Sequence, residues 1–204
     1  MWSRLILRTT GVVVDVQGLE RLVPGRTYVF VANHQSIYDI PILFWSLPFQ
    51  LRIIAKESLG RFPFLGWHLR RTGHMLVNRA RPDRAGPVFR WASALTSKGL
   101  SLIVFPEGTR SRDGRVGRFK GGSFYLALGA GLPVVPLSVV GSRHVMLKGR
   151  LATYPGRVRL VVHEPIDTAA LGGAEPKAFG ERVRQIIVPD AEVDVDHEPV
   201  HGRA

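Results

Sequence analysis

Short apolar runs alternate with stretches of helical spacing along this chain, and that alternation constrains its fold more than any other feature. Runs rich in Val, Ile and Leu have the length of buried strands at residues 11–18, 27–32, 51–55, 74–77, 100–105, 133–140 and 157–162. Helical spacing predicts helices at residues 37–47, 82–98, 121–129 and 176–188, with shorter helical pieces over 58–71. Strands that alternate with helices predict a single α/β domain, in which a mixed, largely parallel central sheet is flanked by helices.

The 204 residues suffice for one domain with a substantial core, which we assign to residues 11–188. Residues 189–204 form an acidic tail with little to bury, and we expect this tail to be disordered. Residues 1–10 are a short N-terminal segment broken by arginines, for which one or two turns of an interfacial amphipathic helix are one hypothesis. No apolar run approaches the ~20 residues of a membrane-spanning helix, so no transmembrane segment is evident.

The charge of the chain is strongly basic and unevenly distributed. There are 28 Lys and Arg against 16 Asp and Glu, and five of those acids lie with one base in residues 190–204. Residues 1–189 therefore carry a net charge of +16. Such a body attracts nucleic acid, anionic lipid headgroups or phosphorylated substrates, although a solvated basic face is the alternative. The lack of cysteine excludes disulfides, Cys-ligated zinc and a thiol nucleophile, and no residue pattern resembles a metal site.

A histidine and an aspartate follow one predicted strand at close spacing. The apolar run 28–32 leads directly into residues 33–39, which read NHQSIYD. A histidine at a strand end can take a proton from a substrate hydroxyl, and here that residue is His34. Asp39 would fix the imidazole tautomer and stabilise the imidazolium that results. Because the substrate supplies the nucleophile, the pattern predicts a transferase that acts on an alcohol.

A second polar segment follows the strand at 100–105, where ligand sites of α/β sheets are found. Gly108 allows close backbone approach, Thr109 supplies a hydroxyl, and Arg110 offers a planar fork suited to phosphate. The sequence leaves two hypotheses open for Glu107. It could bind a hydroxyl of the substrate that accepts the transferred group, or it could hold Arg110 in place. The alternative is a polar turn that carries a surface salt bridge.

Two further cations lie near element ends. Lys120 precedes the helix at 121–129, where backbone amides favour anions, although a glycine pair at this place is also common loop punctuation. The spacing is not that of a Walker phosphate loop, so a nucleotide triphosphatase is not expected. Arg79 follows the strand at 74–77 and taken alone is an ordinary surface arginine. Together with Arg110, these cations predict an anionic substrate beside the histidine.

Four blocks of the chain, taken in order, resemble the glycerolipid acyltransferase family, typified by 1-acyl-glycerol-3-phosphate acyltransferases. The blocks are residues 33–39, 73–79, 105–111 and 132–137, with further matches at 56–60 and 119–122. The first and third blocks are specific, and the resemblance covers roughly residues 11–165. It implies a glycerol-3-phosphate acyltransferase-like fold. It also implies transfer of an acyl group from acyl-CoA or acyl-carrier protein to the sn-2 hydroxyl of lysophosphatidate, with no other cofactor.

The resemblance also assigns roles to residues. His34 would be the general base and Asp39 its partner. The acceptor would be bound by Arg79, Glu107, Gly108, Thr109 and Arg110, with Lys120 and Arg110 near its phosphate. The block 133–136 would shape the floor of the site and the acyl channel. Loop amides near Asn33 or Gly108 are candidate donors to the oxyanion of the tetrahedral intermediate.

Members of this family commonly begin with a longer hydrophobic helical segment, whereas about ten residues precede the first strand here. We therefore expect a cytoplasmic protein held peripherally on the anionic inner face of a membrane by its basic body and an apolar patch. The candidate patch comprises Leu59, Phe62, Pro63, Phe64, Leu65 and Trp67, flanked by Arg61, Arg70 and Arg71. The alternative for these apolar residues is core packing.

Three rival functions follow from the same sequence. The chemistry stays the same if the acceptor is glycerol-3-phosphate, another lysophospholipid or a specialised lipid. A nucleic-acid-binding domain would interleave aromatic and basic residues on a stacking surface, but here the aromatic residues fall mostly within apolar runs. A catalytically silent lipid-binding module would not need the pair of His34 and Asp39.

Overall fold

The computed structural model arranges seven strands in one sheet, in the order β1-β7-β6-β2-β5-β3-β4. It describes residues 2–57, 61, 65–77, 85–171 and 174–193. The strands are β1 (Val12–Gln17), β2 (Val29–Ala32), β3 (Leu51–Lys56), β4 (Met75–Val77), β5 (Ser101–Val104), β6 (Val134–Val140) and β7 (Gly156–Val162). Each lies within two residues of a predicted strand, because short runs rich in Val, Ile and Leu favour strands. β2, β5 and β6 are buried along their whole length, whereas less exposed residues alternate with more exposed ones along β1 and β7.

The sheet is mixed in direction. β2 pairs in parallel with β5 and β6, and β3 pairs in parallel with β4 and β5. β7 runs antiparallel to β6, and β1 runs parallel to β7. The pair of β1 and β7 therefore points the opposite way from the other five strands, which confirms the prediction of a mixed, largely parallel sheet.

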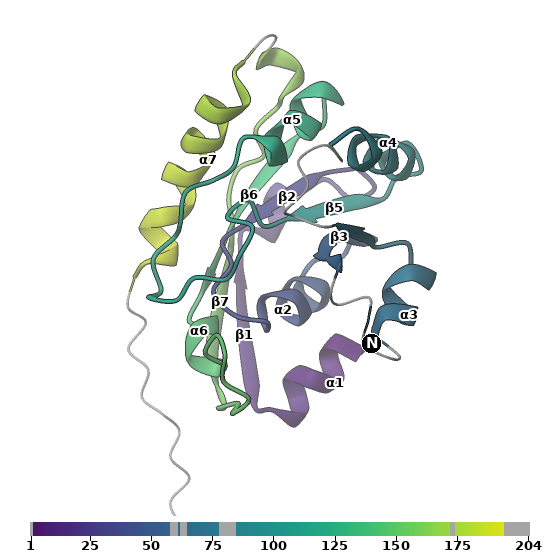
Figure 1. The fold of residues 1–204 in the computed structure, drawn as a ribbon. Coiled ribbons are helices and arrows are strands. Elements are labelled where there is room, and N and C mark those ends of the chain that lie inside the picture. The colour runs from purple at the N-terminus through teal and green to yellow at the C-terminus, as the bar shows by residue number, and fades with distance from the viewer. Residues whose placement is uncertain (1, 58–60, 62–64, 78–84, 172–173, 194–204) are drawn as a thin grey trace, which may run out of the picture.

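Helices cover both faces of the sheet (Figure 1). They are α1 (Trp2–Thr9), α2 (Asp39–Ser46), α3 (Leu65–Arg71), α4 (Ala85–Thr96), α5 (Gly122–Gly129), α6 (Ser142–Val145) and α7 (Pro176–Ala191). Alternate residues of β2 serve the two faces: Phe30 belongs to the cluster packed by α1 and α2, and Val31 to the cluster packed by α5 and α7. This period of two follows from strand geometry and makes β2 buried on both sides.

The carboxyl ends of the parallel strands meet at one edge of the sheet, and the chain leaves several functional segments there. His34 follows β2, and the polar segment that contains Glu107 and Arg110 follows β5. Because β7 is antiparallel to β6, with Val140 paired to Arg159, the connection from α6 into β7 also lies at this edge. Figure 1 shows α1, α6 and that connection gathered at the bottom of the view.

The N-terminal segment forms the helix α1 and packs on the domain. Leu7 is buried, Ile6 packs against the core, and the Trp2 ring lies 5.7 Å from that of Phe44 on α2. Leu5 points into solvent. Within the described residues, no helix combines the length and apolarity that crossing a bilayer requires.

The structure differs from prediction at the C-terminal helix and in one short element. α7 continues to Ala191, three residues past its predicted end, with Pro189 inside its last turn. The missing Pro189 amide costs one hydrogen bond, and the turn is still held by the bond from Glu192 N to the Val188 carbonyl (3.1 Å). The single-turn helix α6 was not predicted. The acidic tail lies outside the described residues beyond residue 193.

Candidate functional site

His34 and Asp39 form the centre of the site at the end of β2. His34 Nδ1 lies 2.8 Å from Asp39 Oδ2. A tight turn over residues 35–38 leads into α2, so the carboxylate at the start of the helix folds back onto the imidazole. Asp39 is fully buried, and the His34 side chain retains 12% of its exposure. With Nδ1 donating to Asp39, the lone pair of Nε2 is left to accept a proton.

One oxygen of Asp39 accepts all of its described hydrogen bonds. Besides His34 Nδ1, Oδ2 accepts from the amides of Gln35 (2.8 Å) and Ser36 (3.0 Å). Oδ1 is buried, and no described residue hydrogen-bonds it. The backbone turn therefore fixes the carboxylate independently of His34, and the helix start favours its negative charge.

Glu107 ties the histidine loop to the loop that follows β5. Its Oε1 accepts from the His34 amide (2.8 Å) and its Oε2 from the Gly117 amide (3.0 Å). Burial raises the pKa of Glu107, against the opposing effect of those two hydrogen bonds. No ion pair of Glu107 with Arg110 occurs among the described side chains, so the structure favours a backbone clamp over the hypothesis that Glu107 holds Arg110.

Neighbouring strands hold the histidine from the other sides. The His34 ring stacks on Phe105 with centroids 4.2 Å apart, and its carbonyl accepts from the Ser111 amide at 2.8 Å. The Asn33 side chain donates to the Val139 carbonyl and accepts from the Val139 amide, both at 2.8 Å. These contacts were not predicted, because each joins residues more than 70 positions apart.

Gly108 and Lys120 lie next to each other. Gly108 has a φ of 72°, and a Cβ placed there would lie 2.8 Å from Lys120 Nζ. The Lys120 amide donates to the Pro106 carbonyl at 3.1 Å, which brings the lysine back to the loop after β5. The predicted neighbourhood of Lys120 and the glycine loop is thus present, and a side chain at position 108 would displace the ammonium group.

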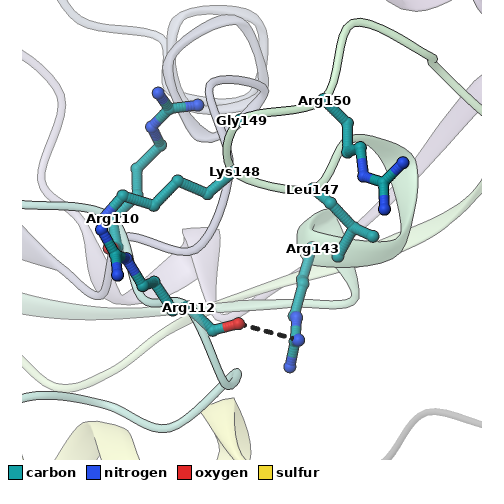
Figure 2. Close-up of a pocket in the computed structure, with 7 residues that line it drawn as sticks. All are labelled: Arg110, Arg112, Arg143, Leu147, Lys148, Gly149 and Arg150. Carbon is teal, nitrogen blue, oxygen red and sulfur yellow. Dashed lines mark hydrogen bonds between the residues drawn. The ribbon is translucent and has the colours of Figure 1, made fainter.

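Arg110 faces an open hollow of about 540 Å³. Figure 2 shows the seven residues around it, which are Arg110, Arg112, Arg143, Leu147, Lys148, Gly149 and Arg150. Lys148 Nζ donates to Thr109 Oγ1 (3.0 Å) and to the Arg110 carbonyl (2.6 Å). Arg143 donates to the Arg112 carbonyl at 2.9 Å. Arg143 and Lys148, which follow β6, therefore hydrogen-bond the loop that carries Arg110 and line the same hollow.

The five cations of this hollow have no acidic partner in the part of the chain that the structure describes. The ion pairs of the described residues lie elsewhere and join Arg21 to Glu164, His34 to Asp39, His163 to Asp190 and Arg184 to Glu181. The hollow is therefore suited to an anion. Arg143, Lys148 and Arg150 were missed by sequence reasoning, because only the antiparallel turn from β6 to β7 brings them to Arg110.

For Arg79, the candidate oxyanion donors and a metal site, the outcome differs from that of Arg110 and Lys120. Arg79 lies outside the described residues, so its convergence with the other cations stays a prediction. The amides of His34, Gln35, Ser36 and Gly108 all donate within the protein, so these loop amides are occupied and do not offer themselves to an oxyanion. No group of three or more His, Asp or Glu side chains among the described residues is arranged to hold a metal ion.

The apolar patch predicted around Trp67 is described only in part. Trp67 is exposed, and the Arg71 guanidinium lies 5.3 Å from its ring centroid. Leu59 and residues 62–64 lie outside the described residues. The block 133–136 forms the start of β6, which is buried along its whole length. It pairs with β2 and so supports the strand that leads into His34.

The arrangement is suited to one kind of chemistry. The oriented imidazole at a strand end can remove a proton from a hydroxyl as that hydroxyl attacks an electrophile. Cations on an adjoining loop can hold an anionic group of the same substrate.

Known proteins are similar to this chain in sequence. The family model named Acyltransferase matches residues 13–140. The chloroplastic 1-acyl-sn-glycerol-3-phosphate acyltransferase BAT2 of Brassica napus is 39% identical over 154 residues, which are 74% of this chain and 44% of that protein. The alpha form from Bos taurus is 31% identical over 179 residues, which are 87% of this chain and 62% of that protein. The chain spans about half the length of the curated relatives it matches.

A solved structure is similar over a larger share of its own length. The crystal structure of the 1-acyl-sn-glycerophosphate (LPA) acyltransferase PlsC from Thermotoga maritima superposes with a TM-score of 0.80 at 34% identity. The match covers 93% of this chain and 75% of that chain.

Proposed function

This chain belongs to the acyltransferase family, and from that premise we propose that it acylates the sn-2 hydroxyl of 1-acyl-glycerol-3-phosphate to give phosphatidate. The acyl group comes from a thioester, either acyl-CoA or acyl-carrier protein. The observation that carries the proposal is the contact of 2.8 Å between His34 Nδ1 and buried Asp39 Oδ2, which leaves Nε2 as the proton acceptor.

The proposed step is a direct transfer without an acyl-enzyme. His34 Nε2 takes the proton of the sn-2 hydroxyl as its oxygen attacks the thioester carbonyl carbon, and a tetrahedral intermediate forms. Collapse of this intermediate breaks the carbon–sulfur bond and forms the ester. The imidazolium then returns its proton to the departing thiolate. Asp39 stabilises the imidazolium meanwhile, so neither metal nor redox chemistry enters the balance.

The cationic loop supports a phosphorylated acceptor. Arg110 lies two residues from Gly108 and one from Ser111, whose amide binds the His34 carbonyl at 2.8 Å. An anion held by Arg110 would therefore lie near the base. Thr109 is exposed and its hydroxyl already accepts from Lys148, and Lys120 lies beside Gly108. We assign the acceptor phosphate to Arg110 with Lys120, as the resemblance implies.

The proposal includes peripheral attachment to a membrane. A lysophosphatidate with one long acyl chain resides mainly in lipid, so the enzyme must meet it at a surface. The basic body of the chain is complementary to the negative potential of the inner leaflet.

An acceptor panel tests this function. Acyl transfer is measured from acyl-CoA and from acyl-carrier protein, of graded chain length, to lysophosphatidate, glycerol-3-phosphate, lysophosphatidylcholine and monoacylglycerol. We expect lysophosphatidate to be preferred, with monoacylglycerol at least tenfold slower because it lacks the phosphate. Arg110→Ala should lower kcat/KM for lysophosphatidate and leave that for monoacylglycerol unchanged, whereas Arg182→Ala, at an exposed position of α7, should alter neither. Equal rates with and without phosphate would reject the assigned acceptor and the role of Arg110.

A further inference from the structure

The α6–β7 loop, residues 146–155, is a closed and well-defined turn. The Tyr154 amide donates to the Val145 carbonyl (2.9 Å), so the two ends of the loop are joined. Inside it, the Arg150 amide donates to the Leu147 carbonyl (3.1 Å). Gly149, between them, has a φ of 86°, which an ordinary side chain rarely adopts. The loop therefore holds its tip in a fixed shape.

The tip of this loop is apolar and exposed. Leu151 is 93% exposed, Tyr154 is 60% exposed and Leu147 is 40% exposed. Each such side chain that stays in water forgoes the free energy that its burial would release. Gathering three of them on one ordered turn is typical of a surface that contacts another apolar phase.

The same loop is joined to the catalytic edge. Ser36, between His34 and Asp39, donates its hydroxyl to the Met146 carbonyl at 2.8 Å. Lys148 donates to the carbonyl of Arg110 at 2.6 Å. Any surface that contacts this loop would therefore lie close to His34 and to the hollow lined by Arg110.

Basic groups surround the apolar tip. Arg143, Lys148 and Arg150 line the hollow of Arg110 in Figure 2, and none has a carboxylate partner among the described residues. Apolar side chains beside unpaired cations match the two layers of an anionic bilayer surface, where acyl chains lie under phosphates.

The end of α1 adjoins the loop and extends the surface. Gly11 packs so closely on Pro155 that a Cβ on the glycine would lie 2.8 Å from the proline side chain. On α1 itself, Leu5 is exposed, and so are Arg4 and Arg8. The helix α1 lies at the same end of the molecule as the α6–β7 loop (Figure 1), and its exposed side chains are likewise apolar and basic.

We propose that the α6–β7 loop docks the protein on anionic lipid bilayers, with Leu147, Leu151 and Tyr154 in the acyl-chain boundary and Arg150 at the level of the phosphates. The inference rests on the proposed function, since it names the surface where that acceptor is met. It assigns docking to a loop that none of the four family blocks includes. A protein partner on the same residues would not require anionic lipid.

The absence of cysteine from the chain allows a direct test of insertion. Leu151→Cys is labelled with an environment-sensitive fluorophore and mixed with phosphatidylcholine vesicles, with or without phosphatidylglycerol. We expect a blue shift, and quenching by a quencher placed in the acyl chains, only with phosphatidylglycerol. Val23→Cys is the control, because Val23 is 55% exposed but precedes β2 at the opposite edge of the sheet. Equal responses at the two positions, or none at Leu151, would overturn the proposal.

Binding gives a second measure. In vesicle co-sedimentation, the double variant L151S/Y154S should bind anionic vesicles about tenfold or more weakly than the parent chain. Arg150→Gln should weaken binding about fivefold, since one cation near an anionic surface contributes about 1 kcal/mol. The matched variant V23S/Y125S, which changes exposed residues elsewhere, should bind like the parent. Parent-like binding by L151S/Y154S would overturn the proposal.

Activity separates failure of docking from failure of the proposed reaction. With a short-chain lysophosphatidate dispersed as monomers, L151S/Y154S should turn over within twofold of the parent chain. With long-chain lysophosphatidate in anionic vesicles, the same variant should lose about tenfold or more. An equal loss in both assays would show a structural defect and reject docking. If the parent chain binds vesicles through this loop but acylates neither form of lysophosphatidate, the proposed reaction is rejected and the docking surface is retained.

Discussion

Asp39 concentrates its described hydrogen bonds on a single buried oxygen, and this explains how a pair five residues apart can act as one group. The two backbone amides set the carboxylate, and the carboxylate sets the imidazole. The pair is predictable from sequence because both members lie within one turn. Its supports, Phe105 and Asn33, are not predictable, because they depend on strands brought together by the sheet.

His34→Ala should abolish acyl transfer, lowering kcat at least 10²-fold, because no other described group is placed to accept the hydroxyl proton. The fold should persist, since Asp39 keeps its two amide donors. Steady-state assays and circular dichroism melting measure the two effects. His163→Ala, at the opposite edge of the sheet, is the control and should keep the parental rate. Substantial activity in the His34 variant would contradict the mechanism.

Asp39→Asn should lower kcat by roughly 10²–10⁴-fold, because the negative charge that stabilises the imidazolium is lost. The new amide nitrogen would also occupy the place of Oδ1, where no described acceptor lies, and this should cost about 1–3 kcal/mol of unfolding free energy. Rates and urea denaturation check both parts. A variant with parental kcat would show that the carboxylate is only structural.

At the scale of elements, short runs rich in Val, Ile and Leu located every strand of the sheet, but they did not predict which strands pair. The order of strands, and hence the meeting of Arg143, Lys148 and Arg150 with Arg110, depends on which edges pair. Nothing local encodes this pairing. The end of α7 was misplaced because a proline such as Pro189 usually ends a helix. Here the Val116 amide donates to Glu192 Oε1 (2.7 Å) and the Gln35 side chain to the Ala191 carbonyl (3.4 Å), and these contacts hold the last turn.

Gly108→Ala should raise the KM for lysophosphatidate several-fold, because the new Cβ meets Lys120 Nζ and displaces it. The φ of 72° also adds strain of about 1–2 kcal/mol to the folded state. Gly99→Ala is the matched control, since Gly99 has a φ of 75° and open space around it. The control should share the loss of melting temperature and keep the parental KM. Equal KM values in the two variants would exclude a role for Lys120 at this loop.

The contact between β6 and α7 should depend on pH. His163 Nε2 lies 2.7 Å from the Ser138 hydroxyl, which also donates to the Ile187 carbonyl. Burial lowers the pKa of His163 below 6.5, with Asp190 opposing and Arg21 reinforcing this shift. The unfolded chain therefore binds more protons between the folded pKa and 6.5, so the unfolding free energy rises with pH across that window.

His163→Gln should remove this dependence. The difference in unfolding free energy between the parent chain and the variant should grow as pH rises through the window and then level off. Urea denaturation at several pH values measures it. A difference that stays constant with pH would show that His163 does not titrate differently in the folded and unfolded states.

At the scale of the whole molecule, the net charge of +16 over residues 1–189 should make surface binding dependent on salt. The Debye length falls from about 30 Å at 0.01 M to about 8 Å at 0.15 M ionic strength, so binding to anionic vesicles should weaken over this range. Turnover of a monomeric short-chain acceptor should change much less. Co-sedimentation and rate assays at matched salt measure the two. A duplex mobility shift that persists at 0.15 M salt would instead favour the nucleic-acid alternative.

The reversal of β7 would set the geometry of the proposed encounter with lipid. A parallel β7 would require a crossover connection, and the residues directly before β7 would then lie at the far rim of the sheet. Because β7 is antiparallel, the loop with Leu151 and the proposed base His34 share one rim. If the loop docks on lipid as proposed, an acceptor would react without leaving its leaflet. The search for substrate becomes two-dimensional, and the rate should follow the mole fraction of acceptor in the surface rather than its concentration in the volume.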